Sequence, residues 1–165
     1  MKTALYVASV ARTYRKAIDD LYESEEQYKA NRDWYDAEIR SCTYRQFTTG
    51  FYFGKPGPES QIYDNTTYSR DSVYLGSVEG IRNDGAIRLT QKNKFCVGDE
   101  IEVMKPDGRD IKVKVLSIED EKGNLQESAP HSKQLIFVKL SDSEGRDVSP
   151  LLEEYDILRV PCTIE

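Results

Sequence analysis

Hydrophobic residues recur at three- and four-residue spacing over residues 4–22, which is the pattern of an amphipathic helix. The apolar stripe consists of Ala4, Val7, Ala8, Ala11, Tyr14, Ile18, Leu21 and Tyr22. The charged positions Arg12, Arg15, Lys16, Asp19 and Asp20 fall largely off this stripe. Thr3 is placed to cap the helix, although Tyr6 stands where a capping box has Glu or Gln. Because this helix begins almost at residue 1, we expect it to belong to a longer polypeptide.

A second, shorter helix is predicted over residues 33–42, after the polar stretch 23–32. It places Tyr35, Glu38, Ile39 and Cys42 along one side. Helices this short are not stable alone in water, because helical stability in proteins comes mainly from tertiary packing. Both helices therefore need a surface on which to lie.

From Asp71 onward the pattern changes to short strands bounded by Gly, Asp and Asn turns. Alternation of apolar and polar residues predicts six strands, over residues 73–79, 86–91, 100–104, 111–115, 134–140 and 156–160. The first two flank Asn83-Asp84-Gly85, a hairpin signal. The fold class we expect is α+β: N-terminal helices followed by a small, mostly antiparallel β-barrel of about six strands, similar to the barrels of translation factors. Closure of the barrel would remove exposed strand edges.

Residues 43–70 contain seven of the 17 aromatic residues of the chain, together with several glycines and prolines. A flexible spacer is polar and poor in aromatics, so we expect an ordered linker between a helical segment (1–42) and the barrel domain (71–165). Stacking faces and cations in and near the linker are suited to contact with single-stranded RNA. The interpretation we favour is that these aromatics pack the helices against the barrel, or this segment against a neighbouring domain. The candidate docking residues are Arg40, Arg45, Phe47, Phe51, Tyr52, Phe53, Lys55 and Arg70.

Charge is distributed unevenly along the chain. Residues 1–70 carry 10 basic and 10 acidic residues, whereas residues 71–165 carry 13 basic and 19 acidic residues, so the net charge of −6 lies in the barrel region. Such a domain cannot hold nucleic acid by overall attraction, because non-specific affinity comes from cations that replace counterions. Any RNA contact must therefore be a local patch or be shared with another domain.

The sequence offers no recognisable catalytic centre. His131 is the only histidine, and next to Pro130 we interpret it as a loop residue that caps or packs. A catalytic triad would need a nucleophile in a suitable context, which Ser128 and Ser132 lack. Three widely spaced cysteines, Cys42, Cys96 and Cys162, indicate reduced thiols rather than a disulfide framework or a zinc site. The sequence shows no phosphate-binding glycine loop, secretory signal or membrane span, so the location we expect by default is the cytoplasm.

Several segments, in order along the chain, resemble one known family. They are Tyr6-Val7-Ala8-Ser9-Val10, Tyr14-Arg15, Thr48-Thr49-Gly50-Phe51-Tyr52-Phe53-Gly54-Lys55-Pro56, Asn93-Lys94-Phe95, Val97-Gly98-Asp99 and Ser128-Ala129-Pro130-His131. They are similar to the C-terminal region of the collagenase-like peptidases, the family of unassigned mechanism numbered thirty-two. This sequence departs from the family where Thr43-Tyr44-Arg45 stands in place of Ser-His-Arg.

The resemblance implies an N-terminal catalytic domain that precedes this region in the same polypeptide. Some members of the family are described as proteases; others resemble hydroxylases that help to make 5-hydroxyuridine at the wobble position of tRNA with prephenate and an iron–sulfur cluster. The cluster ligands belong to the N-terminal domain, so we expect no cofactor and no metal in this chain. We expect a non-catalytic accessory domain that docks tRNA or packs the catalytic domain of such an enzyme. The alternatives are a domain that binds the substrate of a peptidase and a structural module, with a dimer through helix 4–22 as one arrangement.

Overall fold

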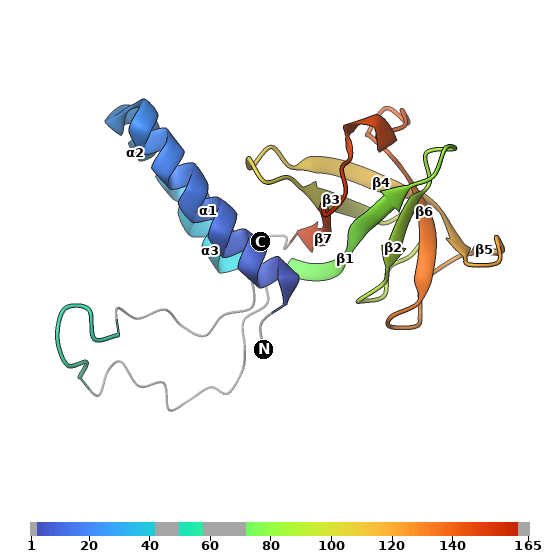
Figure 1. Ribbon diagram of the computed structural model, residues 1–165, viewed down its shortest axis with the longest axis horizontal. Helices are drawn as coiled ribbons and strands as arrows, with labels where there is room; N and C mark the ends of the chain where they lie inside the picture. Colours follow the sequence, from blue (N-terminus) through green and yellow to red (C-terminus); the bar gives the residue numbers. More distant parts are fainter. Residues whose placement is uncertain (1–2, 42–49, 58–71, 162–165) are drawn as a thin grey trace.

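A computed structural model describes residues 3–41, 50–57 and 72–161 (Figure 1). Three helices, α1 (Ala4–Glu23), α2 (Glu25–Ala30) and α3 (Arg32–Ser41), stand together beside a group of strands. The strands are β1 (Ser72–Ile81), β2 (Ile87–Thr90), β3 (Glu100–Met104), β4 (Ile111–Asp120), β5 (Leu125–Gln126), β6 (Leu135–Ser141) and β7 (Ile157–Pro161). None of the helices in the described ranges is long and apolar enough to cross a membrane. The predicted order, helices and then strands, is confirmed.

The strands form a closed, barrel-like ring. Their hydrogen-bonded order is β3-β7-β1-β2-β6-β4-β5, and an additional β3–β4 pairing joins the two sides of the sheet. All of these pairings are antiparallel. The six predicted strands are the six members of the ring, which confirms the expected fold class. The seventh, β5, pairs only with β4 outside the ring, and its two residues are too few to show a periodic pattern.

The interior of the ring is filled by the inward-facing residues of the alternating strands. In β3, Ile101 and Val103 are fully buried while the preceding Glu100 is exposed, as the period of two requires. The core consists of Leu75, Val78, Ile87, Leu89, Phe95, Ile101, Val103, Val113, Val115, Ile118, Ala129, Ile136, Val138, Leu140, Val148, Leu152 and Leu158. This single apolar cluster makes the ring the stable part of the described chain.

Local capping explains where the helices begin. The side chain of Thr3 accepts a hydrogen bond from the Tyr6 backbone N–H at 3.2 Å, which confirms it as the cap of α1. Ser24 caps α2 in the same way, through the backbone N–H of Gln27 at 3.0 Å. The sequence did not predict α2, because its six residues are almost entirely polar.

The helices lie on one another and on the barrel, but α1 uses its polar side for these contacts. Its buried residues are Leu5, Ser9, Arg12, Thr13 and Asp20. The large members of the apolar stripe are exposed to solvent instead. The helix is therefore amphipathic as predicted, with its apolar face unpartnered within the described residues.

Candidate docking surfaces

The turn between β3 and β4 inserts into the angle between α1 and α3. At its tip, Gly108 has a φ of +82°, a conformation that favours glycine. A Cβ atom at this position would lie 2.9 Å from the ring of Trp34 on α3. The same ring lies under two cations of α1, with the Arg12 Cζ 5.6 Å and the Lys16 Nζ 6.0 Å from its centroid. The turn and both helices thus meet at close range.

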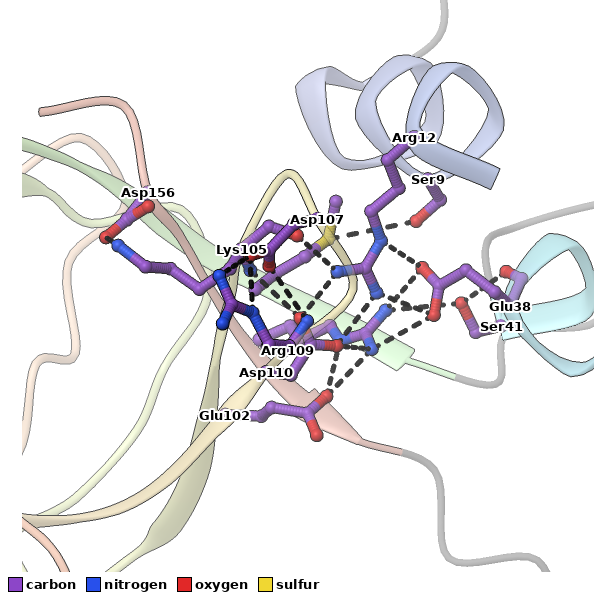
Figure 2. A network of polar contacts seen from close by, with 12 residues as sticks. Ser9, Arg12, Glu38, Ser41, Glu102, Lys105, Asp107, Arg109, Asp110 and Asp156 are labelled. Atoms are coloured by element: carbon purple, nitrogen blue, oxygen red, sulfur yellow. Dashed lines mark hydrogen bonds and ion pairs between the residues drawn. The ribbon is translucent and has the colours of Figure 1, made fainter. Parts of the chain in front are cut away.

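Arg12 is the residue of α1 that binds this turn (Figure 2). Its guanidinium donates to both carboxylate oxygens of Asp110, at 2.5 and 2.8 Å, and to the backbone carbonyl of Lys105 at 2.9 Å. It also donates to Glu38 on α3 at 3.1 Å. One side chain of α1 therefore binds the barrel and the neighbouring helix at once, with the paired geometry that makes Arg–carboxylate contacts strong.

Arg159 on β7 is the matching cation of the barrel. It donates to the two carboxylate oxygens of Glu38 at 2.9 and 3.1 Å, and to Asp110 at 3.0 Å. A further bond, at 2.8 Å, reaches Glu102 on β3. Two guanidinium groups and three carboxylates thus form one network. We call these five residues, Arg12, Glu38, Glu102, Asp110 and Arg159, the joint network.

The joint network is withdrawn from water: the side chains of Arg12 and Glu38 are 3% and 5% exposed. Burial alone would lower the pKa of Arg12, but its hydrogen bonds to Asp110 and Glu38 outweigh that cost and raise the pKa above its ordinary value. The same balance raises the pKa of Arg159, with Glu38 as its main partner. A small apolar group of Leu5, Met104 and Ile157 packs beside the network. The joint between helices and barrel is therefore held mainly by buried charge.

A second buried polar group fixes the helices to one another. Asp20 on α1 accepts hydrogen bonds from the Tyr35 hydroxyl at 2.5 Å and from the Asn31 side chain at 2.8 Å, with Lys16 at 3.3 Å. Burial alone would raise the pKa of Asp20, but these donors lower it. Burial and the Asp20 carboxylate together raise the pKa of Tyr35 to about 12.

The sequence did not single out the joint network as a site. It marked Arg12 only as a residue off the apolar stripe and placed Glu38 on one side of the second helix. The clearest signal was Arg159, a charged residue within the otherwise apolar run of β7. Its partners lie 49 to 121 positions away along the chain, and such separations carry no periodic signal.

Part of the predicted docking set lies on one exposed turn. Phe51, Tyr52 and Phe53 are 78%, 85% and 82% exposed, so these rings do not pack the helices against the barrel. The rings of Tyr52 and Phe53 meet edge to face, with their centroids 4.9 Å apart. Lys55 is exposed on the same turn. We call residues 50–55 the aromatic turn.

The other predicted docking residues are not brought to this turn by any described contact. Arg40 is exposed near the end of α3. Arg45, Phe47 and Arg70 lie outside the described residues, as does most of the predicted linker 43–70.

The exposed face of α1 forms a second candidate surface. Val7, Tyr14, Ile18 and Leu21 are 59%, 62%, 44% and 55% exposed, and exposed Ala11 fills the gap between the first two. Their spacing of four, three, four and three residues is that of a helix that packs along a seam against another element. We call these five residues the α1 seam. Beside it, a cleft of about 380 Å³ opens between α1 and the turn that carries Tyr155.

The candidate metal ligands among the described residues do not form a metal centre. His131 lies in a loop, as expected from sequence, although its side chain is exposed and not packed, and Cys96 is a free, half-buried thiol. Over residues 3–41, 50–57 and 72–161, no group of three or more His, Cys, Asp or Glu side chains is arranged to hold a metal ion. These residues therefore do not fit an iron–sulfur cluster, which is held by several cysteine thiolates.

The described chain is thus a closed ring of strands joined to three helices by the joint network, with apolar and aromatic side chains exposed. Residues 70–159 match Peptidase family U32 C-terminal domain, and residues 1–62 match Peptidase family U32. The chain belongs to this family, which confirms the resemblance of its motifs. The boundary between the two matches falls between α3 and β1, so the joint network links the two parts.

The curated relatives are tRNA hydroxylation proteins. The chain is 32% identical over 141 residues to tRNA hydroxylation protein P1 of Bacillus subtilis (strain 168), covering 85% of this chain and 33% of the relative. It is 29% identical over 130 residues to tRNA hydroxylation protein P of Escherichia coli (strain K12), covering 78% and 28%. The chain thus spans about a third of the length of these relatives.

A solved structure is also similar. It is the crystal structure of the C-terminal domain of a Geobacillus thermoleovorans protein described as a U32 peptidase, at 28% identity and a TM-score of 0.44. The match covers 53% of this chain and 98% of that one.

Proposed function

We propose that this chain is a non-catalytic accessory part of a U32-family protein that acts in tRNA hydroxylation, and that the α1 seam docks it on the catalytic domain of the same polypeptide. The observation that carries the proposal is the exposure of Val7, Tyr14, Ile18 and Leu21 on one face of a helix. Contiguous apolar surface of this kind marks an interaction site. We assign tRNA as the substrate, and the cytoplasm as the location, of the full-length protein to which this chain belongs.

The division of the chain between two family matches supports the choice of partner. The seam lies within residues 1–62, which match Peptidase family U32 itself, and the barrel matches the C-terminal domain. Helices α1 to α3 are thus the part of the chain that we expect to continue the packing of the catalytic domain. We assign the iron–sulfur cluster and prephenate implied by the family to that domain.

A chimera tests this proposal. This chain replaces the matching third of the Bacillus subtilis relative, and hydroxylated tRNA is measured by mass spectrometry in cells that lack the native protein. We expect the chimera to restore hydroxylation and Ile18→Asp with Leu21→Asp to abolish it. The control, Glu25→Ala with Lys29→Ala, removes an exposed ion pair of α2 and retains activity.

Full hydroxylation of tRNA by the chimera with Ile18→Asp and Leu21→Asp would show that the α1 seam does not dock on the catalytic domain. An inactive wild-type chimera would argue against the assignment to this kind of enzyme. A stable dimer of the isolated chain that the seam substitutions dissociate would instead favour self-association through α1.

RNA contact at the aromatic turn is a second candidate, favoured by three exposed rings next to Lys55. Unstacked bases bind to such rings, and each base stacked on an aromatic side chain contributes about 1–3 kcal/mol. Replacing Phe51, Tyr52 and Phe53 together by Ala should therefore weaken binding of an in vitro transcribed tRNA. Unchanged affinity would exclude the turn as the contact.

A further inference from the structure

Two stretches of the barrel contain no acidic residue, although the domain as a whole is acidic. Residues 86–98 and 128–141 together hold five of the 13 basic residues of the region 71–165 and none of its 19 acidic residues. The remaining residues of the barrel therefore carry all of its negative charge. This separation along the chain matters only if the two stretches also meet in space.

The fold brings the two stretches together. Strands β2 and β6, one from each stretch, pair from Ile87↔Val138 to Thr90↔Leu135. Beyond the strands, the Gln91 N–H donates to the Gln134 carbonyl at 2.9 Å, and the Lys133 N–H donates to the Gln91 carbonyl at 2.8 Å.

The loops that follow the paired strands are joined as well. The Ala129 N–H donates to the Phe95 carbonyl at 2.9 Å, and the buried Gln91 side chain donates to the Ala129 carbonyl at 2.8 Å. The loops 92–98 and 128–134 thus form one hydrogen-bonded surface with a fixed arrangement.

Three lysines on this surface are free to bind a ligand. Lys92, Lys94 and Lys133 are exposed, and none of them forms an ion pair with any described residue. The other two cations of the stretches are occupied, Arg88 by Glu79 at 3.7 Å and Lys139 by Asp84 at 3.3 Å.

Two of the acidic residues near these loops accept hydrogen bonds from backbone N–H groups. The Asp99 carboxylate accepts from the Cys96 backbone N–H at 2.8 Å, and that of Asp120 accepts from the backbone N–H groups of Lys122 and Asn124. Glu127 is exposed next to the loop 128–134, and Asp120 and Glu121 line a pocket together with Lys133. We call Lys92, Lys94 and Lys133 the lysine surface.

The backbone at Lys133 supports a role in binding. Its φ of +68° lies in the left-handed region, which a residue other than glycine adopts at a cost. Such conformations persist where the surrounding structure holds them and are concentrated at binding sites. Here the backbone bonds of the neighbouring Gln134 and of Lys133 itself hold the conformation.

We propose that the lysine surface binds phosphate groups of the RNA backbone, a contact that rests on the RNA-binding role proposed above and adds a site on the barrel to it. Three unpaired cations on a rigid surface can each replace a counterion of the nucleic acid. The acidic residues elsewhere in the barrel repel the same backbone, which would favour contact at these lysines over other parts of the barrel. Contacts at the lysine surface would position the RNA backbone, and stacking at the aromatic turn would contact the bases.

Salt-dependent binding of an in vitro transcribed tRNA to the 165-residue chain tests the lysine surface, with fluorescence anisotropy between about 25 and 200 mM salt. Replacing Lys92, Lys94 and Lys133 by Gln should reduce the slope of log affinity against log salt by about two to three, since each phosphate contact contributes roughly 0.7 to 0.9. The matched control replaces Lys29, Lys112 and Lys114 by Gln. Lys29 forms an ion pair with Glu25 on α2, and Lys112 and Lys114 lie across the strands from Glu102 and Glu100, so this equal change of charge should leave the slope unaltered.

Several results would overturn the lysine surface. Equal losses in both triple variants would show that only net charge matters, and an unchanged slope in the lysine-surface variant would show no phosphate contact. If the lysine-surface substitutions weaken the binding of heparin and of tRNA equally, the lysines attract any polyanion and do not recognise RNA. If binding is lost only when Phe51, Tyr52 and Phe53 are replaced by Ala, the RNA contacts the aromatic turn and not the lysine surface. If the wild-type chain does not bind tRNA, both proposed contacts are wrong. Equal thermal midpoints of the variants establish that each is folded.

Discussion

Arg159 on β7 donates hydrogen bonds to both carboxylate oxygens of Glu38 on α3, at 2.9 and 3.1 Å, across 121 positions of the sequence. Glu38 also binds Arg12, so one buried carboxylate lies between a guanidinium of the helices and a guanidinium of the barrel. This arrangement fixes the direction in which the helices leave the barrel. The α1 seam is thereby held at a set position relative to the barrel loops.

Removal of Glu38 should weaken the whole joint. In Glu38→Ala the cations Arg12 and Arg159 stay buried with one carboxylate fewer, and breaking a buried pair in this way costs about 3–5 kcal/mol. The free energy of unfolding from urea titration measures the loss. Glu25→Ala, which breaks the exposed pair with Lys29, is the control and should cost less than about 1 kcal/mol. Equal effects of the two substitutions would mean that the joint network adds no stability.

The turn at Gly108 offers a matched pair of substitutions. Gly108 and Gly123 share a φ of +82°, so Ala at either position is strained by about 1–2 kcal/mol. At Gly108 the new methyl group would also lie 2.9 Å from the Trp34 ring, whereas at Gly123 nothing lies within 4 Å. Gly108→Ala should therefore lower the urea midpoint further than Gly123→Ala. A smaller effect at Gly108 would show that Trp34 does not close over the turn.

The hydrogen bond between Tyr35 and Asp20 predicts a dependence of stability on pH. The pKa of Tyr35 is raised to about 12, against roughly 10 for an unperturbed tyrosine. Its contribution to stability is therefore complete below pH 10 and is lost as the pH rises through about 12, because the unfolded chain releases this proton first.

Tyr35→Phe isolates this effect from the other tyrosines. The variant should be less stable than wild type at pH 8, since Asp20 loses a donor, and the gap should narrow between pH 10 and 12. Thermal unfolding followed by circular dichroism at each pH gives the comparison. A gap that stays constant over this range would contradict the raised pKa.

The two sides of α1 should respond differently to the same truncation. Leu5 is buried against Met104 and Ile157, whereas Leu21 is exposed in the α1 seam. Leu5→Ala should cost about 2–5 kcal/mol of unfolding free energy, and Leu21→Ala should stay within about 0.5 kcal/mol. Chemical denaturation of the isolated chain checks both. A large loss at Leu21 would show that the seam is already covered in this chain.

The helices and strands could be predicted largely because their signals are local. The alternation Glu100, Ile101, Glu102, Val103 identified β3 with its correct bounds, and the turn at Asn83-Asp84-Gly85 identified the β1–β2 hairpin. Spacing along α1 gave its limits to within a residue. The two shortest elements were not predicted, because neither the six residues of α2 nor the two residues of β5 show a periodic pattern.

The contacts of α1 could not be predicted in the same way. Periodicity shows that a helix has an apolar face, but not whether this chain or another surface covers it. Here the buried side carries Arg12, whose partners Glu38 and Asp110 lie 26 and 98 positions away along the chain. The aromatic turn was found from composition alone, whereas the exposure of its three rings, which argues against packing inside the described chain, carries no signal in the sequence.

The closed order of the strands restricts how any partner can bind. Each of the six ring strands has a hydrogen-bonded neighbour on both sides, so a peptide cannot extend the ring as an added strand. Only β5 lies at an edge among the described strands, and two residues are a poor template. Any partner of this domain must therefore bind to side chains or loops rather than to a strand edge, and these can change between related proteins without altering the ring.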